Sequence, residues 1–253
     1  MKTVVIFATH VYNAEIERQV KKLRDEIGEL ATLYLVYQQD AAHVDVPEHI
    51  RSFPFTLEEL NRLGYHSWGC TLMDGNFHFV PLYFYLNNPD YDWYWLIEYD
   101  VRFSGDWGTF FSFFEDKKED FISAHIEDTD ENPDWPRWEE LELANLPMSK
   151  VKLLKSFNPI CRFSNRALAL LHERCRLGDR GHNELLMPTL FNYYRLRIAD
   201  FGGNGKFIYV GQPDLFYADN PGCPDEDKCT HRYRPAYKEE DMLVPNMIYH
   251  PIK

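Results

Sequence analysis

The first forty residues alternate short apolar runs with a segment of helical periodicity. Residues 3–9 (TVVIFAT) are rich in β-branched side chains, which is typical of a buried strand. In residues 14–30 the apolar side chains recur every three or four positions, which predicts an amphipathic helix. Residues 31–37 (ATLYLVY) form a second apolar run. The order strand, helix, strand predicts a βαβ unit and a parallel sheet.

The alternation continues along the rest of the chain. We expect further strands over residues 92–97, 120–126, 153–162 and 198–201. We expect further helices over residues 76–88, 107–115, 164–176 and 183–194, the third capped by Ser164. The predicted fold class is α/β, with a Rossmann-type, mainly parallel central sheet flanked by helices.

Three irregular segments separate these elements. Residues 41–74 and 202–235 are rich in residues that favour loops. Residues 127–142 combine an acidic run with two prolines and two tryptophans, so we expect the first half of this segment to be a surface loop outside the core. None of these segments resembles a linker, and there is no internal repeat, so we expect one domain over residues 1–253.

The charge balance limits the partners. Lys and Arg total 27 against 40 for Asp and Glu, a formal net charge of −13. Proteins bind phosphate backbones through broad cationic surfaces, so we expect no nucleic-acid partner. Aromatic residues make up 16% of the chain, an excess that suits either a heavy core or a surface that stacks on sugars.

No feature of the sequence predicts export or membrane insertion. No apolar run reaches the length of a membrane span, and the run from Val4 to Ala8 is too short for a signal peptide. The five cysteines, Cys70, Cys161, Cys175, Cys223 and Cys229, are widely spaced and include no CxxC pair. We therefore expect a cytoplasmic protein with reduced thiols.

The sharpest candidate site is the pair of acidic residues in Glu98-Tyr99-Asp100, which follows the predicted buried strand 92–97. Residues two apart in an extended chain point to the same side, about 6.5 Å apart, which is close enough to hold one divalent cation, Mn²⁺ or Mg²⁺. Open α/β sheets bind ligands at the carboxyl ends of their strands. A pattern of two acids separated by one residue is expected about six times by chance in so acidic a chain, so its position after a buried strand carries the prediction.

This arrangement resembles the GT-A fold of nucleotide-sugar glycosyltransferases, and distantly the core-2 branching and xylosyltransferase group. The resemblance rests on the βαβ opening, on residues 98–105 (EYDVRFSG), on residues 158–168 (NPICRFSNRAL), on Gly181-His182-Asn183-Glu184 and on the closing residues 249–253 (YHPIK). It implies a nucleotide-binding half at about residues 1–105 and an acceptor half at about residues 106–253. It also implies a sugar transfer from a nucleotide-diphosphate donor to a hydroxyl acceptor, as in polysaccharide or glycoconjugate assembly.

The catalytic base of such a transfer is predicted to be Glu184. An inverting transfer needs one carboxylate to take the proton of the acceptor hydroxyl, and the resemblance places Glu184 in the element that carries it. His182 and Asp179 are close enough in sequence to compete for the role. The alternative is that Glu184 only caps the helix that follows, and a retaining mechanism would need no such base.

Candidate donor contacts lie at the ends of the predicted strands and of the chain. Thr9, His10 and Asp40 follow the first two strands, and Arg102 follows the acidic pair. If the tail folds back over the cleft, His250 would supply a third metal ligand and Lys253 a cation for phosphate. For His10 the alternative is a solvated strand end, and for Arg102 it is a salt bridge to Glu98 or Asp100.

Two tryptophans are candidate acceptor contacts. Trp135 and Trp138 would stack on an acceptor sugar from the acidic loop, or else anchor that loop to the core. Two other functions stay open: a nucleotidyltransferase or nucleotide-sugar hydrolase with the same metal carboxylates, and a non-catalytic carbohydrate-binding domain.

Overall fold

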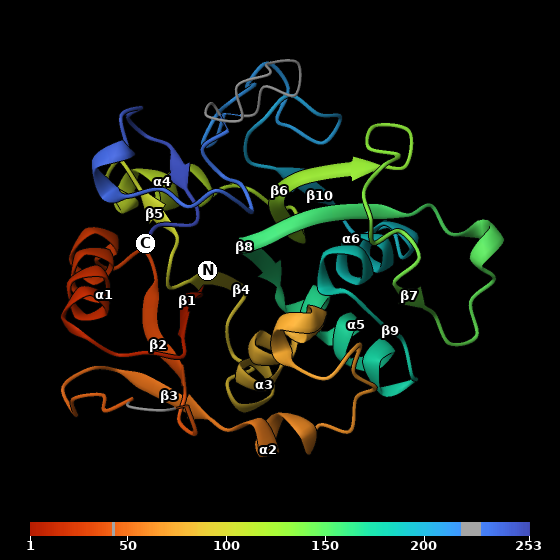
Figure 1. Cartoon of the computed structure of the whole chain (residues 1–253), viewed down its shortest axis with the longest axis horizontal. Helices are drawn as coiled ribbons and strands as arrows, with labels where there is room; N and C mark the ends of the chain where they lie inside the picture. The colour runs from red at the N-terminus through yellow and green to blue at the C-terminus, as the bar shows by residue number, and fades with distance from the viewer. Residues whose placement is uncertain (42–43, 219–228) are drawn as a thin grey trace.

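A seven-stranded sheet forms the centre of the computed structural model, which describes residues 1–41, 44–218 and 229–253 (Figure 1). Its strand order is β10-β6-β8-β4-β1-β2-β3. The strands are β1 (Thr3–Thr9), β2 (Thr32–Gln38), β3 (Ser52–Phe55), β4 (Trp93–Glu98), β6 (Phe121–Asp128), β8 (Leu154–Ser164) and β10 (Ile198–Asp200). Strand β8 runs antiparallel to β4 and β6, and the other described neighbours are parallel. The predicted α/β class with a mainly parallel sheet is confirmed.

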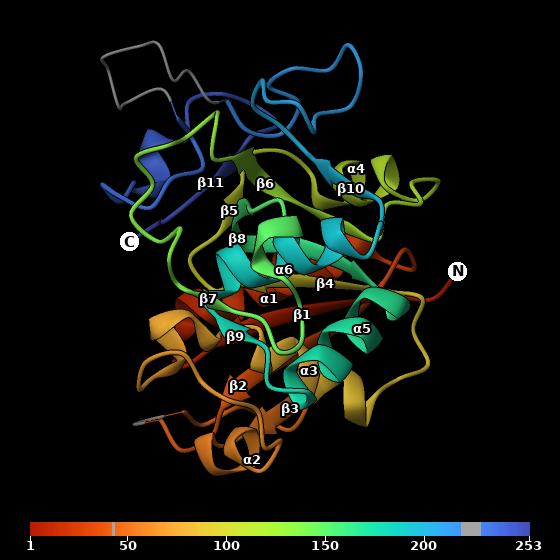
Figure 2. The same cartoon turned by 90° about the vertical axis from the view of Figure 1, so that its right-hand side faces the viewer.

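Helices cover both faces of this sheet. The helices are α1 (Ala14–Ile27), α2 (Leu57–Asn61), α3 (Phe79–Asn87), α4 (Trp107–Phe113), α5 (Asn165–Arg176) and α6 (Asn183–Tyr193). Alternate residues of β1 and β4 point to opposite faces, so that Val5 and Trp95 pack with α1 and α4, whereas Val4 and Leu96 pack with α3, α5 and α6. Figure 2 shows the second group of helices on one side of the strands. The sheet is therefore buried on both faces, as the apolar runs predict.

Capping residues set where the two best-defined helices begin. Asn13 Oδ1 accepts a hydrogen bond from the Ile16 amide at 3.0 Å at the start of α1. Ser164 Oγ accepts from the Ala167 amide at 3.1 Å at the start of α5, which confirms Ser164 as the cap. These side chains satisfy amides that the helix itself leaves unpaired.

Two irregular segments differ from expectation. The segment 41–74 contains the edge strand β3, α2 and part of a π-type turn (Leu72–Asn76), because short elements built on tertiary contacts give little periodic signal. The prediction of a surface loop from residue 127 onward was wrong for its first two residues, since β6 continues through Asp128. Asp128 is buried and pairs with Lys152 at 2.8 Å and Lys206 at 3.0 Å, which neutralises its charge. Cys223 lies outside the described residues.

The C-terminal strap, residues 237–253, packs against the segment that follows β4. Its strand β11 (Ile248–Tyr249) pairs antiparallel with β5 (Arg102–Phe103), and Glu239–Asp241 forms a 3₁₀ turn. Other short elements among the described residues are β7 (Leu141–Glu142), β9 (Arg180–Gly181) and a 3₁₀ turn at Met148–Lys150. The strap therefore brings the end of the printed sequence to the residues that follow β4.

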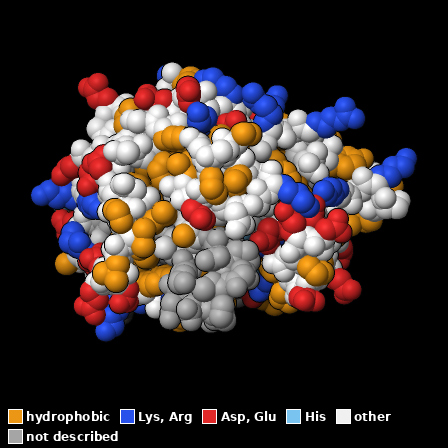
Figure 3. All heavy atoms as spheres, turned by 90° about the horizontal axis from the view of Figure 1, so that it is seen from above, with side chains coloured by type: hydrophobic (Ala, Val, Ile, Leu, Met, Phe, Trp, Pro, Cys, Tyr) orange, Lys and Arg blue, Asp and Glu red, His pale blue; other side chains and the backbone are white. Residues whose placement is uncertain are grey.

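On the face seen in Figure 3, hydrophobic side chains gather toward the middle and charged ones of both signs surround them. Exposed large hydrophobic residues of the C-terminal third include Val210, Tyr233 and Leu243. None of the helices in the described ranges has the length and apolar character needed to cross a membrane.

Candidate metal and transfer site

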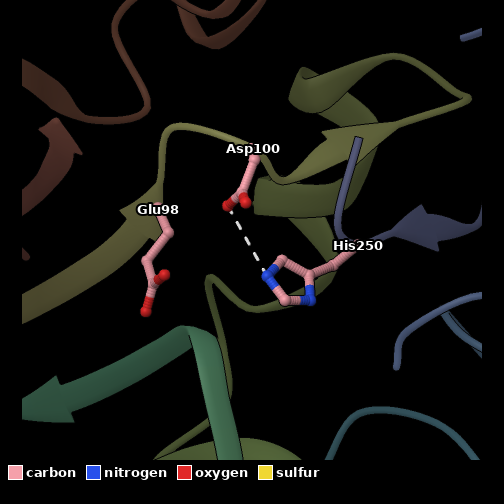
Figure 4. Close-up of side chains that lie close together, drawn as sticks. All are labelled: Glu98, Asp100 and His250. Carbon is pink, nitrogen blue, oxygen red and sulfur yellow. Dashed lines mark ion pairs between the residues drawn. The ribbon is translucent and has the colours of Figure 1, made fainter. Parts of the chain in front are cut away.

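The candidate site lies at the carboxyl edge of the sheet, where β1 and β4 end side by side. Glu98 is the last residue of β4, Asp100 lies in the turn that follows, and His250 comes directly after β11. One ligand atom from each of the three residues lies within 4.8 Å of the other two. Figure 4 shows Asp100 and His250 pointing toward each other, with Glu98 beside them. The structure thus brings together the three residues predicted as metal ligands.

Hydrogen bonding prepares two of these residues to bind a cation. His250 Nδ1 lies 2.7 Å from the Arg232 carbonyl oxygen, which can only accept, so Nδ1 donates to it and Nε2 is the nitrogen that faces Asp100. Nε2 lies 3.5 Å from Asp100 Oδ1. Asp100 Oδ1 is buried and has no hydrogen-bond partner among the described residues. A buried carboxylate oxygen without a partner is costly, and a divalent cation would satisfy it.

The electrostatics of the acidic pair also fit a cation. Burial and the neighbouring carboxylates of Asp100 and Glu184 raise the pKa of Glu98 to about 8. Burial works against ionisation of Asp100 too, but His250 and Lys253 hold its pKa below the usual range. Carboxylates that repel one another without a compensating cation are the arrangement that a bound divalent ion neutralises. The two carboxylates and the imidazole therefore fit a divalent metal ion by chemistry and by charge.

Glu184 lies close enough to Glu98 for their charges to interact, although it comes from α6 on a different part of the chain. Burial raises the pKa of Glu184 to about 7, while Lys155, Arg137 and His125 oppose that rise. This is the range in which a carboxylate serves as a general base near neutral pH.

The start of α6 is fixed by His182. Its Nδ1 accepts from the Glu184 amide at 3.3 Å and lies 3.7 Å from Glu184 Oε2. Burial lowers the pKa of His182 to about 4, so the ring is neutral and its Nδ1 is an acceptor at neutral pH. The ring packs against Gly75 in the 72–76 turn, where a Cβ would lie 2.6 Å from His182 Cδ2. Side-chain capping of α6 therefore comes from His182, and the charge of the Glu184 carboxylate acts on Glu98.

The predicted donor contacts near the ends of β1 and β2 differ in their surroundings. Thr9 Oγ1 donates to the Val11 carbonyl at 2.7 Å and accepts from the Val11 amide. His10 is exposed, and its ring meets that of Tyr99 edge to face at 5.0 Å between centroids. Asp40 Oδ2 accepts from the Leu57 amide at 3.0 Å and so holds the start of α2. Among the described contacts of these three residues, the ring contact of His10 with Tyr99 is the one that reaches residues 98–100.

Arg102 and Lys253 lie on the two chains that meet at the acidic pair. The Arg102 guanidinium is buried and bonds to backbone carbonyls and to Glu15 and Glu239, not to Glu98 or Asp100. Lys253 is exposed, and its charge is near enough to lower the pKa of Asp100. Lys253 therefore has an electrostatic effect on the site.

Trp135 and Trp138 pack edge to face on each other, with ring centroids 5.0 Å apart. Both are partly buried against the α3–α5–α6 core, and Trp138 Nε1 donates to the Asn132 carbonyl at 2.8 Å. The pair anchors the loop to the core while it keeps part of each ring exposed.

Sequence reasoning missed the cations around Glu184. Lys155 lies on β8 and pairs with Glu127 at 2.8 Å, and Arg137 pairs with Glu140 at 2.8 Å. A lysine between the apolar residues at the start of a predicted strand is a signal that could have identified Lys155. Nothing local marks Arg137 or His125, because only the fold brings them near Glu184.

No protein-family model matches this sequence, and no curated protein matches it. Among solved structures, the chain is similar to a crystal structure described as a putative glucose-1-phosphate thymidylyltransferase from Bacillus anthracis in complex with a sucrose. The two share 13% sequence identity over 79% of this chain and 86% of the other, with a TM-score of 0.39. The likeness is a distant one of fold, and it assigns no activity to this chain.

Proposed function

We propose that this protein is a glycosyltransferase that moves a sugar from a nucleotide-diphosphate sugar to a hydroxyl group of a carbohydrate or glycoconjugate acceptor. The observation that carries the proposal is the convergence of Glu98, Asp100 and His250 within 4.8 Å at the carboxyl edge of the sheet. Ligands of open α/β sheets bind at this edge. The nearby Glu184, with its pKa near neutrality, supplies the base that an inverting transfer needs.

The donor diphosphate belongs beside the acidic pair. Glu98, Asp100 and His250 would hold a divalent cation, Mn²⁺ or Mg²⁺, which when bound would offset the charge of the leaving diphosphate. Lys253 adds a positive charge on the strap side of the same edge. His10 and Tyr99 offer aromatic edges next to this place.

The acceptor belongs on the α6 side. Glu184 would take the proton of the attacking hydroxyl as the oxygen bonds to the sugar, so its carboxylate must be ionised before transfer. His182 holds the backbone of Glu184 in place, and Lys155 and Arg137 favour its ionised form. Trp135 and Trp138 would present their exposed edges to an acceptor sugar.

Ligand-dependent stabilisation tests the proposal. A ligand that binds only the folded protein raises its melting temperature, so the purified protein is screened against UDP, GDP, CDP, CMP and their sugars, each with Mn²⁺ and with EDTA. We expect one nucleoside diphosphate and its sugar to stabilise the protein with Mn²⁺ and not with EDTA. The same shift should vanish in D100A and persist in the control D116A, because Asp116 is an exposed residue paired with Lys117.

Product analysis separates the alternatives. A new glycoside supports the transferase, whereas pyrophosphate or free sugar from the same donor indicates a nucleotidyltransferase or a hydrolase. If no nucleotide stabilises the protein under any condition, the proposal fails in favour of a non-catalytic binding domain.

A further inference from the structure

The buried guanidinium of Arg102 connects the two parts of the chain that build the candidate metal site. Its Nη1 donates to the carbonyl oxygens of Tyr99 at 2.7 Å and Val101 at 3.0 Å. These carbonyls flank Asp100, so Arg102 holds the turn that carries it. Arginine suits this place because its planar fork donates in several directions at once.

The other nitrogens of Arg102 bind acidic side chains from two distant segments. Nη2 donates to Glu15 Oε1 of α1 at 3.0 Å, and Nε donates to Glu239 Oε1 of the C-terminal strap at 3.3 Å. Glu239 Oε1 also accepts from Arg18 Nη2 at 2.5 Å and from Gln19 Nε2 at 3.0 Å. We call this group, Arg102 with Glu15, Arg18, Gln19 and Glu239, the clasp.

The strap that Glu239 anchors is the segment that carries His250. A backbone hydrogen bond continues the attachment, because the Ile252 amide donates to the Asp100 carbonyl at 2.9 Å. Within the strap, the Lys253 amide donates to the Tyr237 carbonyl at 2.9 Å. Tyr237, Tyr249 and Ile252 form a small apolar cluster inside the strap. Movement of the strap away from the 99–102 turn would therefore remove His250 from Glu98 and Asp100.

We propose that the clasp is a positioning device, in which Arg102 and Glu239 fasten the strap to the 99–101 turn and thereby hold His250 beside Glu98 and Asp100. This inference rests on the proposed metal site. It assigns Arg102 to assembly of the site and not to direct contact with the donor. Because binding and docking are thermodynamically linked, a cation that bridges Asp100 and His250 must in turn hold the strap in place.

Hydrogen exchange of the strap tests the clasp without any assay of activity. The variant is E239A and its matched control is E240A, since the adjacent Glu240 is exposed and pairs only with Lys238 at 3.4 Å in the described contacts. In EDTA, E239A should speed exchange of the Tyr237, Ile252 and Lys253 amides about tenfold, because local opening becomes easier. E240A should leave these amides as in the wild type.

Metal affinity provides the readout that a merely structural role would not change. Titration with Mn²⁺ alone should show E239A binding about three- to tenfold more weakly than the wild type or E240A, because fewer molecules have His250 in position. In an H250A background, E239A should change the affinity less than twofold, because the ligand that the clasp positions is already absent.

The outcomes separate the clasp from the proposed function. If the strap amides exchange hydrogen at the same rate in E239A and E240A, the clasp is overturned. It is also overturned if E239A weakens Mn²⁺ binding as much in the H250A background as it does in the wild type. Wild-type protein that binds no Mn²⁺ refutes the metal site and the proposed function instead. Saturating Mn²⁺ should also slow hydrogen exchange of the strap amides in the wild type. If Mn²⁺ binds without slowing this exchange, the proposed link between His250 and the strap is contradicted.

Discussion

Two acidic side chains lie at opposite edges of the same sheet and differ in how their charge is compensated. Asp120 precedes β6 at the amino edge and accepts from Ser164 Oγ at 2.9 Å, Arg166 Nε at 2.6 Å and the Arg197 amide at 2.9 Å. Although burial disfavours its charge, these partners lower the pKa of Asp120 below the usual range. At the carboxyl edge, burial and neighbours of its own sign raise the pKa of Glu98 to about 8.

The difference distinguishes a structural carboxylate from one that is left for a ligand. A fold that needs a buried acid for its own stability surrounds it with donors, as it does for Asp120. Glu98, Asp100 and Glu184 lie near one another at the carboxyl edge, and this arrangement is stable only at a cost that a bound cation would relieve. Neutralising a carboxylate should therefore destabilise the protein at the amino edge and stabilise the metal-free protein at the carboxyl edge. Four predictions compare the stability and the activity that depend on the two edges.

The largest expected effect is a loss of turnover when a residue near the carboxyl edge is replaced. E184Q removes the proposed base while it keeps the size of the side chain, so kcat of the proposed transfer should fall about 10³-fold, about 4 kcal/mol of transition-state stabilisation. Donor binding should persist, because the change leaves Glu98, Asp100 and His250 intact. Steady-state kinetics with a donor-binding assay checks both, and unchanged turnover would remove Glu184 from the mechanism.

Stability should suffer most at the amino edge. D120N leaves Arg166 and the Arg197 amide without their charged acceptor, so the free energy of unfolding should fall by about 2–3 kcal/mol. Denaturant unfolding of D120N beside the exposed control D116N measures it. Mn²⁺-dependent donor binding should survive in D120N, and its loss would show that the two edges are not separate.

At the carboxyl edge, removal of a charge should instead stabilise the metal-free protein. Glu98 loses its proton at about pH 8 when folded and near 4.5 when unfolded. The folded state therefore binds more protons between these values, and stability falls as pH rises through this window. In EDTA at pH 8, E98Q should be about 1–2 kcal/mol more stable than the wild type, with a weaker dependence on pH. A destabilised E98Q would mean that Glu98 has favourable partners in the fold.

The smallest effect is the pH dependence of the transfer. Because burial raises the pKa of Glu184 to about 7 and the base must be ionised, kcat should rise about tenfold between pH 6 and pH 8. A pH–rate profile at saturating donor and Mn²⁺ measures this limb. A flat profile over this range would exclude a base with this pKa.

Much of the architecture could be predicted because it depends on local periodicity. The βαβ opening, the buried strand before Glu98 and the Ser164 cap all follow from side chains within a few residues of one another. The edge strand β3 and helix α2 could not, since each is short and is stabilised by its neighbours.

Only part of the candidate site could be predicted from the sequence. Glu98 and Asp100 are adjacent to a strong strand signal, but their meeting with His250 depends on a tail that folds back through tertiary contacts. The partners that Arg102 has in the structure, Glu15 and Glu239, are 87 and 137 residues away along the chain, so sequence spacing could not predict these pairings. Long-range pairing of this kind leaves no local pattern.

Gly75 should tolerate few substitutions although it has no functional side chain. Its φ of +108° and the closeness of the His182 ring leave no room for a side chain. Any replacement would push the ring that caps α6, and Glu184 would move with it. In a deep mutational scan for activity, Gly75 should therefore tolerate as few amino acids as the acidic residues that we propose for catalysis and metal binding. Substitution of Gly28, which has open space around its Cβ position, should mainly reduce stability.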